Sequence, residues 1–158
     1  MIRVSLFMTV LIYIVAVGLM IFADQFSKFF IVSHFALGQK LTVIENFFQI
    51  TNVRNTGAGF SILTDQTAFL SAVSLLAVIA LIYLLRKEKD LLTRISYLMI
   101  IAGAIGNLID RFRLGYVVDF LDFYIFGYDF PVFNIADSFI TVGCFLLILI
   151  NLKESRHA

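Results

Sequence analysis

Two aspartates stand in an aromatic stretch between the last two apolar segments of the chain. Asp119 occurs in Val-Val-Asp-Phe, and Asp137 ends the run Phe-Asn-Ile-Ala-Asp. An ionised side chain at a membrane boundary is costly, and it persists mainly where it is paired, hydrated or functional. Two carboxylates in close contact can share a proton, because their like charges raise the pKa of one group while the other stays ionised. This pair is therefore a candidate for general acid and base chemistry.

Several other chemistries lack their residues. His34 and His157 lie far apart, and no H-E-x-x-H motif occurs to bind a catalytic zinc. The chain has no S-x-x-K motif, and the run from Gly57 to Ser61 does not complete G-x-S-x-G. The G-x-x-x-x-G-K-[ST] phosphate loop is also missing. What remains is a set of carboxylates, amides and arginine.

Structural roles compete with catalysis for some of these residues. Asn134 and Asp137 fit the N-cap and third position of a helix, where a carboxylate meets the positive end of the helix dipole. Asp24 and Lys28 are four residues apart and could pair on one helix face, a contact worth about 0.3 to 0.5 kcal/mol on an exposed helix. Taken alone, each of these residues is explained without catalysis.

Composition identifies a membrane protein. Of the 158 residues, 61% are hydrophobic and only 15% are charged, so little sequence remains for a separate soluble domain. We expect one domain over residues 1–158. The net charge of +1 provides no basic field for nucleic acid, which is not expected as a partner. The single cysteine, Cys144, cannot form an internal disulfide.

Four apolar runs are candidate transmembrane helices, because about 20 helical residues cross a bilayer core. They cover Val4–Ala23, Thr67–Leu85, Ile95–Leu108 and Ser138–Leu152. A cleaved signal peptide is disfavoured for the first run, because Asp24-Gln25 follows where small residues would mark a cleavage site. The third and fourth runs are short and must borrow flanking residues, which places Asn107, Asp110 and Arg111 at the end of the third helix and Asn134 and Asp137 at the start of the fourth.

The basic residues indicate an orientation. Arg3, Arg86, Lys87, Lys89, Arg94, Lys153 and Arg156 all fall on one side of a four-span arrangement. The positive-inside rule makes that side, and both termini, cytoplasmic. Both aspartates then face outward. In the first outer segment, Leu41–Ile44 and Phe47–Val53 predict a small hairpin or sheet around Glu45-Asn46. The aromatic second outer segment, Phe112–Asp137, is expected on the membrane surface.

Four stretches in order resemble the signature boxes of the lipoprotein signal peptidases, which are aspartyl membrane peptidases of bacteria. They are Asp24-Gln25-Phe26-Ser27-Lys28; Asn55-Thr56-Gly57-Ala58-Gly59-Phe60; Gly103 to Arg111 continuing into Gly115 to Phe120; and Phe133-Asn134-Ile135-Ala136-Asp137. The first box alone would be a weak signal, but four boxes in order on a four-span chain are highly specific.

The resemblance implies cleavage of diacylglyceryl-modified prolipoproteins before the lipidated cysteine, with Asp119 and Asp137 as the catalytic pair. It implies an all-α membrane fold of four transmembrane helices, with a small extracytoplasmic β-sheet cradle and a surface helix, in the bacterial cytoplasmic membrane. No metal or organic cofactor is expected, and we expect a monomer in contact with membrane lipid. Substrate binding or support of the site is expected of Asn55, Gly57, Asn107, Arg111 and Asn134. A structural or more remote supporting role is expected of Asp24, Lys28 and Asp110.

Two other functions fit a small polar membrane site. A transporter or proton-conducting protein would also carry intramembrane charges, but here the polar residues gather at one face and leave the inner halves of the spans apolar. A non-catalytic membrane scaffold is the third reading. Retained biological activity in an Asp119 and Asp137 double variant would favour the scaffold.

Overall fold

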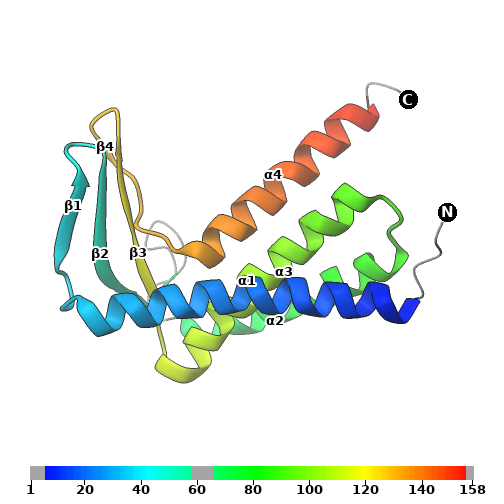
Figure 1. Ribbon diagram of the computed structural model, residues 1–158, viewed down its shortest axis with the longest axis horizontal. Helices are drawn as coiled ribbons and strands as arrows, with labels where there is room; N and C mark the ends of the chain where they lie inside the picture. The colour runs from blue at the N-terminus through cyan, green and yellow to red at the C-terminus, as the bar shows by residue number, and fades with distance from the viewer. Residues whose placement is uncertain (1–5, 58–65, 156–158) are drawn as a thin grey trace.

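The computed structural model describes residues 6–57 and 66–155, which form four long helices and a small sheet (Figure 1). The helices are α1 (Leu6–His34), α2 (Thr67–Lys87), α3 (Leu91–Leu114) and α4 (Ile135–Ser155). Each is long and apolar enough to cross a membrane, which confirms the four predicted spans. α1, α3 and α4 extend beyond the predicted runs into polar sequence, so α1 continues past Ala23 to include Asp24 and Lys28.

Local signals in the sequence set both ends of α3. At its start, the Asp90 side chain accepts a hydrogen bond from the Thr93 main-chain N–H at 2.8 Å, as an N-cap residue does. At its end, Gly115 adopts a φ of 81°, a left-handed conformation that glycine allows without a Cβ penalty. Its N–H donates to the Arg111 carbonyl at 3.1 Å. The last turn of α3 is therefore closed beside the residues of interest.

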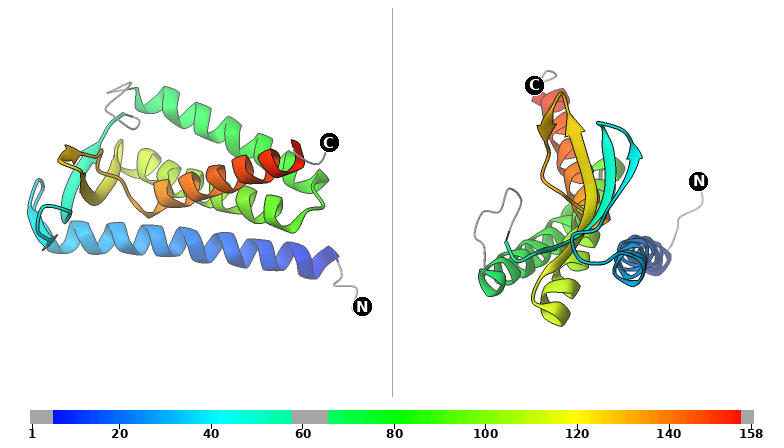
Figure 2. Two further views of the ribbon diagram at one scale, coloured as in Figure 1. Left: turned by 90° about the horizontal axis from the view of Figure 1, so that it is seen from above. Right: turned by 90° about the vertical axis from the view of Figure 1, so that its left-hand side faces the viewer.

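α3 is the central helix of the bundle. More than half of its membrane-spanning window is buried, and α1, α2 and α4 all pack against it (Figure 2). Small residues allow the close approach. A Cβ atom at Gly103 would lie 2.3 Å from the main-chain oxygen of Ala136 on α4, and one at Gly106 would lie 2.6 Å from the Asp24 carboxylate on α1. Ala102, beside Gly103, is also buried.

A four-stranded antiparallel sheet lies at one end of the bundle, in the order β1-β2-β3-β4 (Figure 1). Its strands are β1 (Lys40–Ile44), β2 (Phe48–Asn55), β3 (Val117–Ile125) and β4 (Tyr128–Asp129). The β1–β2 hairpin confirms the sequence prediction, with Asn46 at a positive φ of 56° in the turn. No helix besides the four occurs in residues 6–57 and 66–155, so the surface helix implied by the resemblance has no counterpart there.

The sequence did not predict β3 or β4. The aromatic segment was expected only to lie on the membrane surface, but Val117–Ile125 pairs with β2 in the centre of the sheet. The alternation of side chains along this strand explains its place in the sheet. Val118 and Phe120 are buried against Ile31 of α1, while Asp119 between them faces the opposite side. This pairing brings Asp119 beside the end of β2, because Asn55 lies opposite Val117.

Candidate active site

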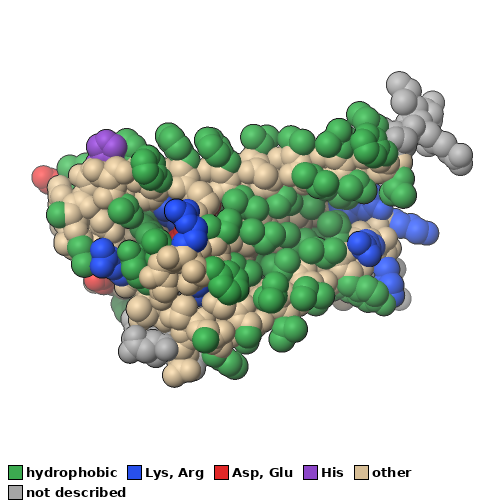
Figure 3. All heavy atoms as spheres, turned by 90° about the horizontal axis from the view of Figure 1, so that it is seen from below, with side chains coloured by type: hydrophobic (Ala, Val, Ile, Leu, Met, Phe, Trp, Pro, Cys, Tyr) green, Lys and Arg blue, Asp and Glu red, His purple; other side chains and the backbone are tan. Residues whose placement is uncertain are grey.

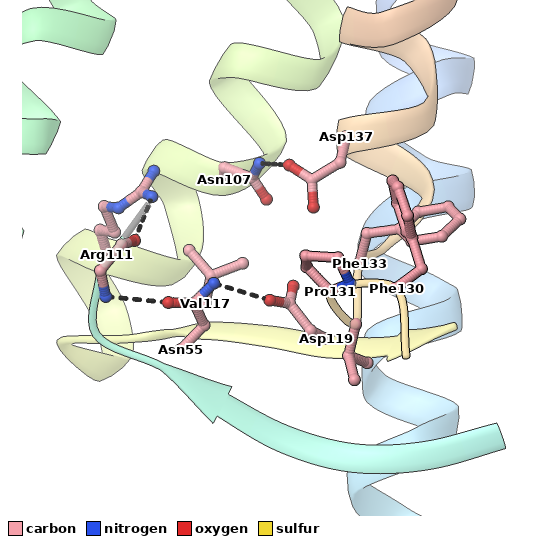
Figure 4. Close-up of a pocket in the computed structure, with 11 residues that line it drawn as sticks. Asn55, Asn107, Arg111, Val117, Asp119, Phe130, Pro131, Phe133 and Asp137 are labelled. Carbon is pink, nitrogen blue, oxygen red and sulfur yellow. Dashed lines mark hydrogen bonds between the residues drawn. The ribbon is translucent and has the colours of Figure 1, made fainter. Parts of the chain in front are cut away.

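A cavity of about 210 Å³ opens where the end of α3, the start of α4 and strand β3 meet (Figure 4). It is lined by Asn55, Gly57, Asn107, Arg111, Val117, Asp119, Phe130, Pro131, Val132, Phe133 and Asp137. The structure thus places six of the predicted site residues around one space, although they come from four separate stretches of sequence. Asn134 lies immediately behind the wall and is fully buried.

Asp119 is held on β3 with both carboxylate oxygens bonded. Oδ2 accepts from Asn55 Nδ2 at 2.9 Å, and Oδ1 accepts from Asn134 Nδ2 at 2.6 Å. The residue is only 2% exposed. Burial, together with the nearby negative charge of Asp137, raises the pKa of Asp119 to about 7 even though both amides favour the ionised form. This carboxyl can therefore hold a proton near neutral pH.

Asp137 is fixed at the start of α4 by a reciprocal cap. The Asp137 N–H donates to Asn134 Oδ1 at 2.9 Å, and the Asn134 N–H donates to Asp137 Oδ2 at 3.2 Å. The capping role predicted for both residues is correct. The other oxygen of Asp137 accepts from Asn107 Nδ2 at 2.7 Å, and the carboxylate faces the cavity (Figure 4). A capping position is thus also a position in the site, since the cap fixes the carboxylate at the cavity wall.

The side-chain amide of Asn134 links the two halves of the site. It donates to Asp119 and, at 3.2 Å, to the side-chain oxygen of Asn107. The Nδ2 group of Asn107 in turn donates to Asp137. The two aspartates are therefore connected through two buried amides. Each amide donates one hydrogen bond to a carboxylate, which fixes both acidic groups in orientation.

A buried charge cluster supports the site from behind. Lys28 Nζ lies 2.9 Å from Asp24 and 3.0 Å from Asp110, and it donates to Asn107 Oδ1 at 3.0 Å. The predicted Asp24–Lys28 pair is present. The interaction free energy of an exposed helix pair does not apply to it, because both side chains are almost fully buried. None of these three charged residues lines the cavity. Lys28 contacts the site through Asn107, whereas Asp24 and Asp110 accept from the main-chain N–H groups of Ala136 and Val118, which are next to Asp137 and Asp119.

Sequence reasoning assigned no role to Gln25. Its Nε2 donates to Asp110 Oδ1 at 2.9 Å and to the Gly106 carbonyl at 3.1 Å, which joins α1 to α3 beneath the cavity. The available signal was its place between Asp24 and Lys28 in the first box. The apolar cavity wall from Phe130 to Phe133 was also not predicted as part of the site, because its place depends on the pairing of Phe133 with Leu121 of β3.

Arg111 and Gly57 form the remaining wall. A guanidinium nitrogen of Arg111 donates to the Gly57 carbonyl at 3.3 Å, and the Gly57 N–H donates to Asn55 Oδ1 at 2.9 Å. These contacts tie the segment after β2 to the end of α3. The later residues of the second box, Ala58, Gly59 and Phe60, lie outside the described residues, as do Arg3 and Arg156. Within the described ranges, no three His, Cys, Asp or Glu side chains gather as a metal site.

The fold and the site together define a four-span membrane protein whose helix ends and small sheet enclose two carboxylates. A family model described as Signal peptidase (SPase) II matches residues 14–153. The lipoprotein signal peptidase of Syntrophus aciditrophicus is 39% identical over 154 residues, covering 93% of this chain and 96% of that protein. The Staphylococcus aureus protein of the same name is 42% identical over 146 residues, covering 91% and 89%.

Solved structures agree with this assignment. Two structures described as bacterial membrane enzymes superpose with TM-scores of 0.86 and 0.81, at 39% and 40% identity. The first match covers 90% of this chain and 88% of that one, and the second covers 89% and 92%. The chain therefore belongs to the signal peptidase II family and is a membrane peptidase.

Proposed function

We propose that the protein is an aspartyl endopeptidase that removes the signal peptide from diacylglyceryl-modified prolipoproteins, cutting before the lipidated cysteine. The observation that carries this proposal is that Asp119 of β3 and Asp137 of α4 line the same small cavity. The names of the relatives support the substrate class. The positive-inside rule applied to Arg86, Lys87 and Lys89 supports a site near the outer face of the bacterial cytoplasmic membrane, with both termini cytoplasmic.

The two aspartates take different parts in the reaction. We assign Asp137 as the base, with a main-chain N–H at the start of α4 and the amide of Asn107 donating to its carboxylate. It takes a proton from water, whose oxygen attacks the scissile carbonyl carbon. Asp119 is the acid, because its pKa of about 7 leaves it protonated over the slightly acidic range. Its O–H donates to the carbonyl oxygen, and a proton passes to the leaving amine as the C–N bond breaks.

The other cavity residues position the substrate. Arg111 is a cation at the wall opposite the apolar residues, and its guanidinium can bind a carbonyl of the precursor backbone. Asn55 holds Asp119 and, through Gly57, the segment that follows β2. Phe130 and Phe133 provide an apolar surface for side chains next to the cleavage point. We expect the protein to act as a monomer.

The first test changes each carboxylate to its amide. Asp119→Asn and Asp137→Asn should each abolish cleavage of a lipidated precursor by purified protein, while the variants still insert and fold. Asp122→Asn is the matched control, because Asp122 is a buried aspartate on the same strand that contacts Lys40 and does not line the cavity. Robust turnover by either of the first two variants would disprove the dyad.

The second test addresses the substrate. The same precursor is prepared with and without the diacylglyceryl group on its cysteine, and cleavage of both forms is followed by mass spectrometry. The proposal requires cleavage of the lipidated form only or by preference. Equal rates for the two forms would contradict the substrate class and leave the dyad untouched.

A further inference from the structure

A second and larger cavity lies at the opposite end of the bundle from the aspartates. It is a groove of about 1030 Å³ between α1 and α2, and α3 forms its floor. Its wall is mainly aliphatic and includes Val10, Val17, Ile82, Leu98 and Ile101. Figure 3 shows hydrophobic side chains over the middle of this face, with one group of Lys and Arg side chains at its right-hand end and others toward its left-hand end. None of these residues takes part in the proposed reaction.

Two arginines stand at the basic end of the groove. Arg86, in the last turn of α2, is exposed, and Arg94, in the first turn of α3, is half-buried; both line the groove. Arg94 donates to the Glu88 carbonyl through Nε at 2.8 Å and to the Tyr13 hydroxyl at 3.2 Å. Among the described residues, every ion pair involves Lys28 or Lys40, so neither arginine has a carboxylate partner there.

We propose that this groove binds an anionic phospholipid of the cytoplasmic leaflet, with its phosphate between Arg86 and Arg94 and an acyl chain along α3. The order of chemistry along the groove matches that molecule, because a cationic mouth is followed by a continuous aliphatic wall. Guanidinium groups bind phosphate oxygens well, and anionic headgroups are concentrated on the cytoplasmic surface. The bound chain would fill the space between α1 and α2 and contact the helix that carries Asn107 and Arg111.

The arginines disfavour a protein helix in the same place. A signal peptide keeps its positively charged n-region on the cytoplasmic side, and other membrane helices also carry Lys and Arg at that end. A parallel-inserted helix in the groove would therefore place like charges beside Arg86 and Arg94. The phosphate of an anionic lipid would instead be attracted by the two arginines. The proposal does not depend on the cleavage reaction, so the two can fail separately.

The experiment measures retention of lipid by the purified full-length protein. Delipidated protein in a neutral detergent is incubated with dioleoyl phosphatidylglycerol or with dioleoyl phosphatidylcholine, and bound lipid is counted by native mass spectrometry. The wild type should retain phosphatidylglycerol in preference to phosphatidylcholine. Arg86→Gln should weaken phosphatidylglycerol binding by about tenfold or more, the usual effect of losing one charge-assisted contact. Lys87→Gln is the matched control, since Lys87 is the next residue of α2 and does not line the groove.

A second variant blocks the apolar part of the site. Gly18 lines the groove, and a Cβ atom built there meets nothing within 4 Å, so Gly18→Leu extends a side chain from α1 into the groove. This variant should exclude the lipid, whereas Val15→Leu, on the exposed surface of α1, should not. Any one of the following results would overturn the proposal: equal retention of the two lipids, equal loss of binding in Arg86→Gln and Lys87→Gln, unchanged binding in Gly18→Leu, or displacement of the lipid by a synthetic signal peptide.

Discussion

The hydrogen bond from Asn55 to Asp119 makes a sharp prediction about the pH dependence of cleavage. Asn55 Nδ2 donates to the carboxylate at 2.9 Å and thereby lowers the pKa of Asp119 below the value that burial alone would give. If protonated Asp119 is the acid, kcat/KM must fall as the pH rises through about 7. Asn55→Leu removes the donor with little change of volume. The pKa of Asp119 must then rise, so the alkaline limb of the profile moves to higher pH.

The size of the shift follows from the contact that is lost. A hydrogen bond to a charged group contributes about 1.5 to 3 kcal/mol, and one pKa unit corresponds to about 1.4 kcal/mol. Water entering the small cavity would replace part of the bond, so we expect the lower end of this range. The alkaline limb should move up by about one pH unit. The maximal rate of Asn55→Leu should also fall, because Asn55 orients Gly57, and the position of the limb is therefore the diagnostic quantity.

The assay is the initial rate of cleavage of a fluorogenic lipidated peptide at substrate concentrations well below KM, from acidic to alkaline pH. Asn52→Leu is the control, because Asn52 is a buried asparagine of the same strand that donates to the Phe35 carbonyl and does not contact the dyad. Its alkaline limb should coincide with that of the wild type. An unchanged or lower limb in Asn55→Leu would refute Asp119 as the group whose protonated form is required.

Three further predictions concern stability. The pKa of Asp119 is about 7 in the folded protein and near 4 in the unfolded chain, so between these pH values the folded protein binds one proton more. The free energy of unfolding should therefore fall as the pH rises through this range, by up to about 4 kcal/mol. Asp119→Asn should flatten that pH dependence, measured by chemical unfolding followed by circular dichroism. Lys28→Met leaves two buried carboxylates without their cation and should lower the free energy of unfolding by about 3 to 5 kcal/mol. Asp110→Asn keeps the Lys28–Asp24 pair and should lower it less. Equal losses of stability in the two variants would argue against the charge cluster. Gly103→Ala places a Cβ atom against the main chain of α4 and should lower both thermal stability and activity, whereas Gly18→Ala meets open space and should do neither.

The sequence was sufficient for the elements that depend on local composition and pattern. Four apolar runs predicted the four helices, and β-branched and aromatic residues around Glu45-Asn46 predicted the first hairpin. The cap at Asn134 and Asp137 was predictable because it involves residues three apart in the chain. The strand Val117–Ile125 was not predicted, because its partner β2 lies more than 60 residues earlier and its aromatic residues equally suit a membrane surface.

The residue types of the site, and their division between the ends of two helices and two outer segments, follow from the sequence alone. Only the tertiary structure brings Asn55, Asp119 and Asp137 around one cavity, because strand pairing and the packing of α3 against α4 set their positions. It also turns the Asp24–Lys28 pair from an ordinary helix contact into a buried cluster behind the site. The protonation of Asp119 is likewise decided by tertiary structure, since burial and the charge of a second carboxylate are properties of neighbours that the chain supplies only when folded.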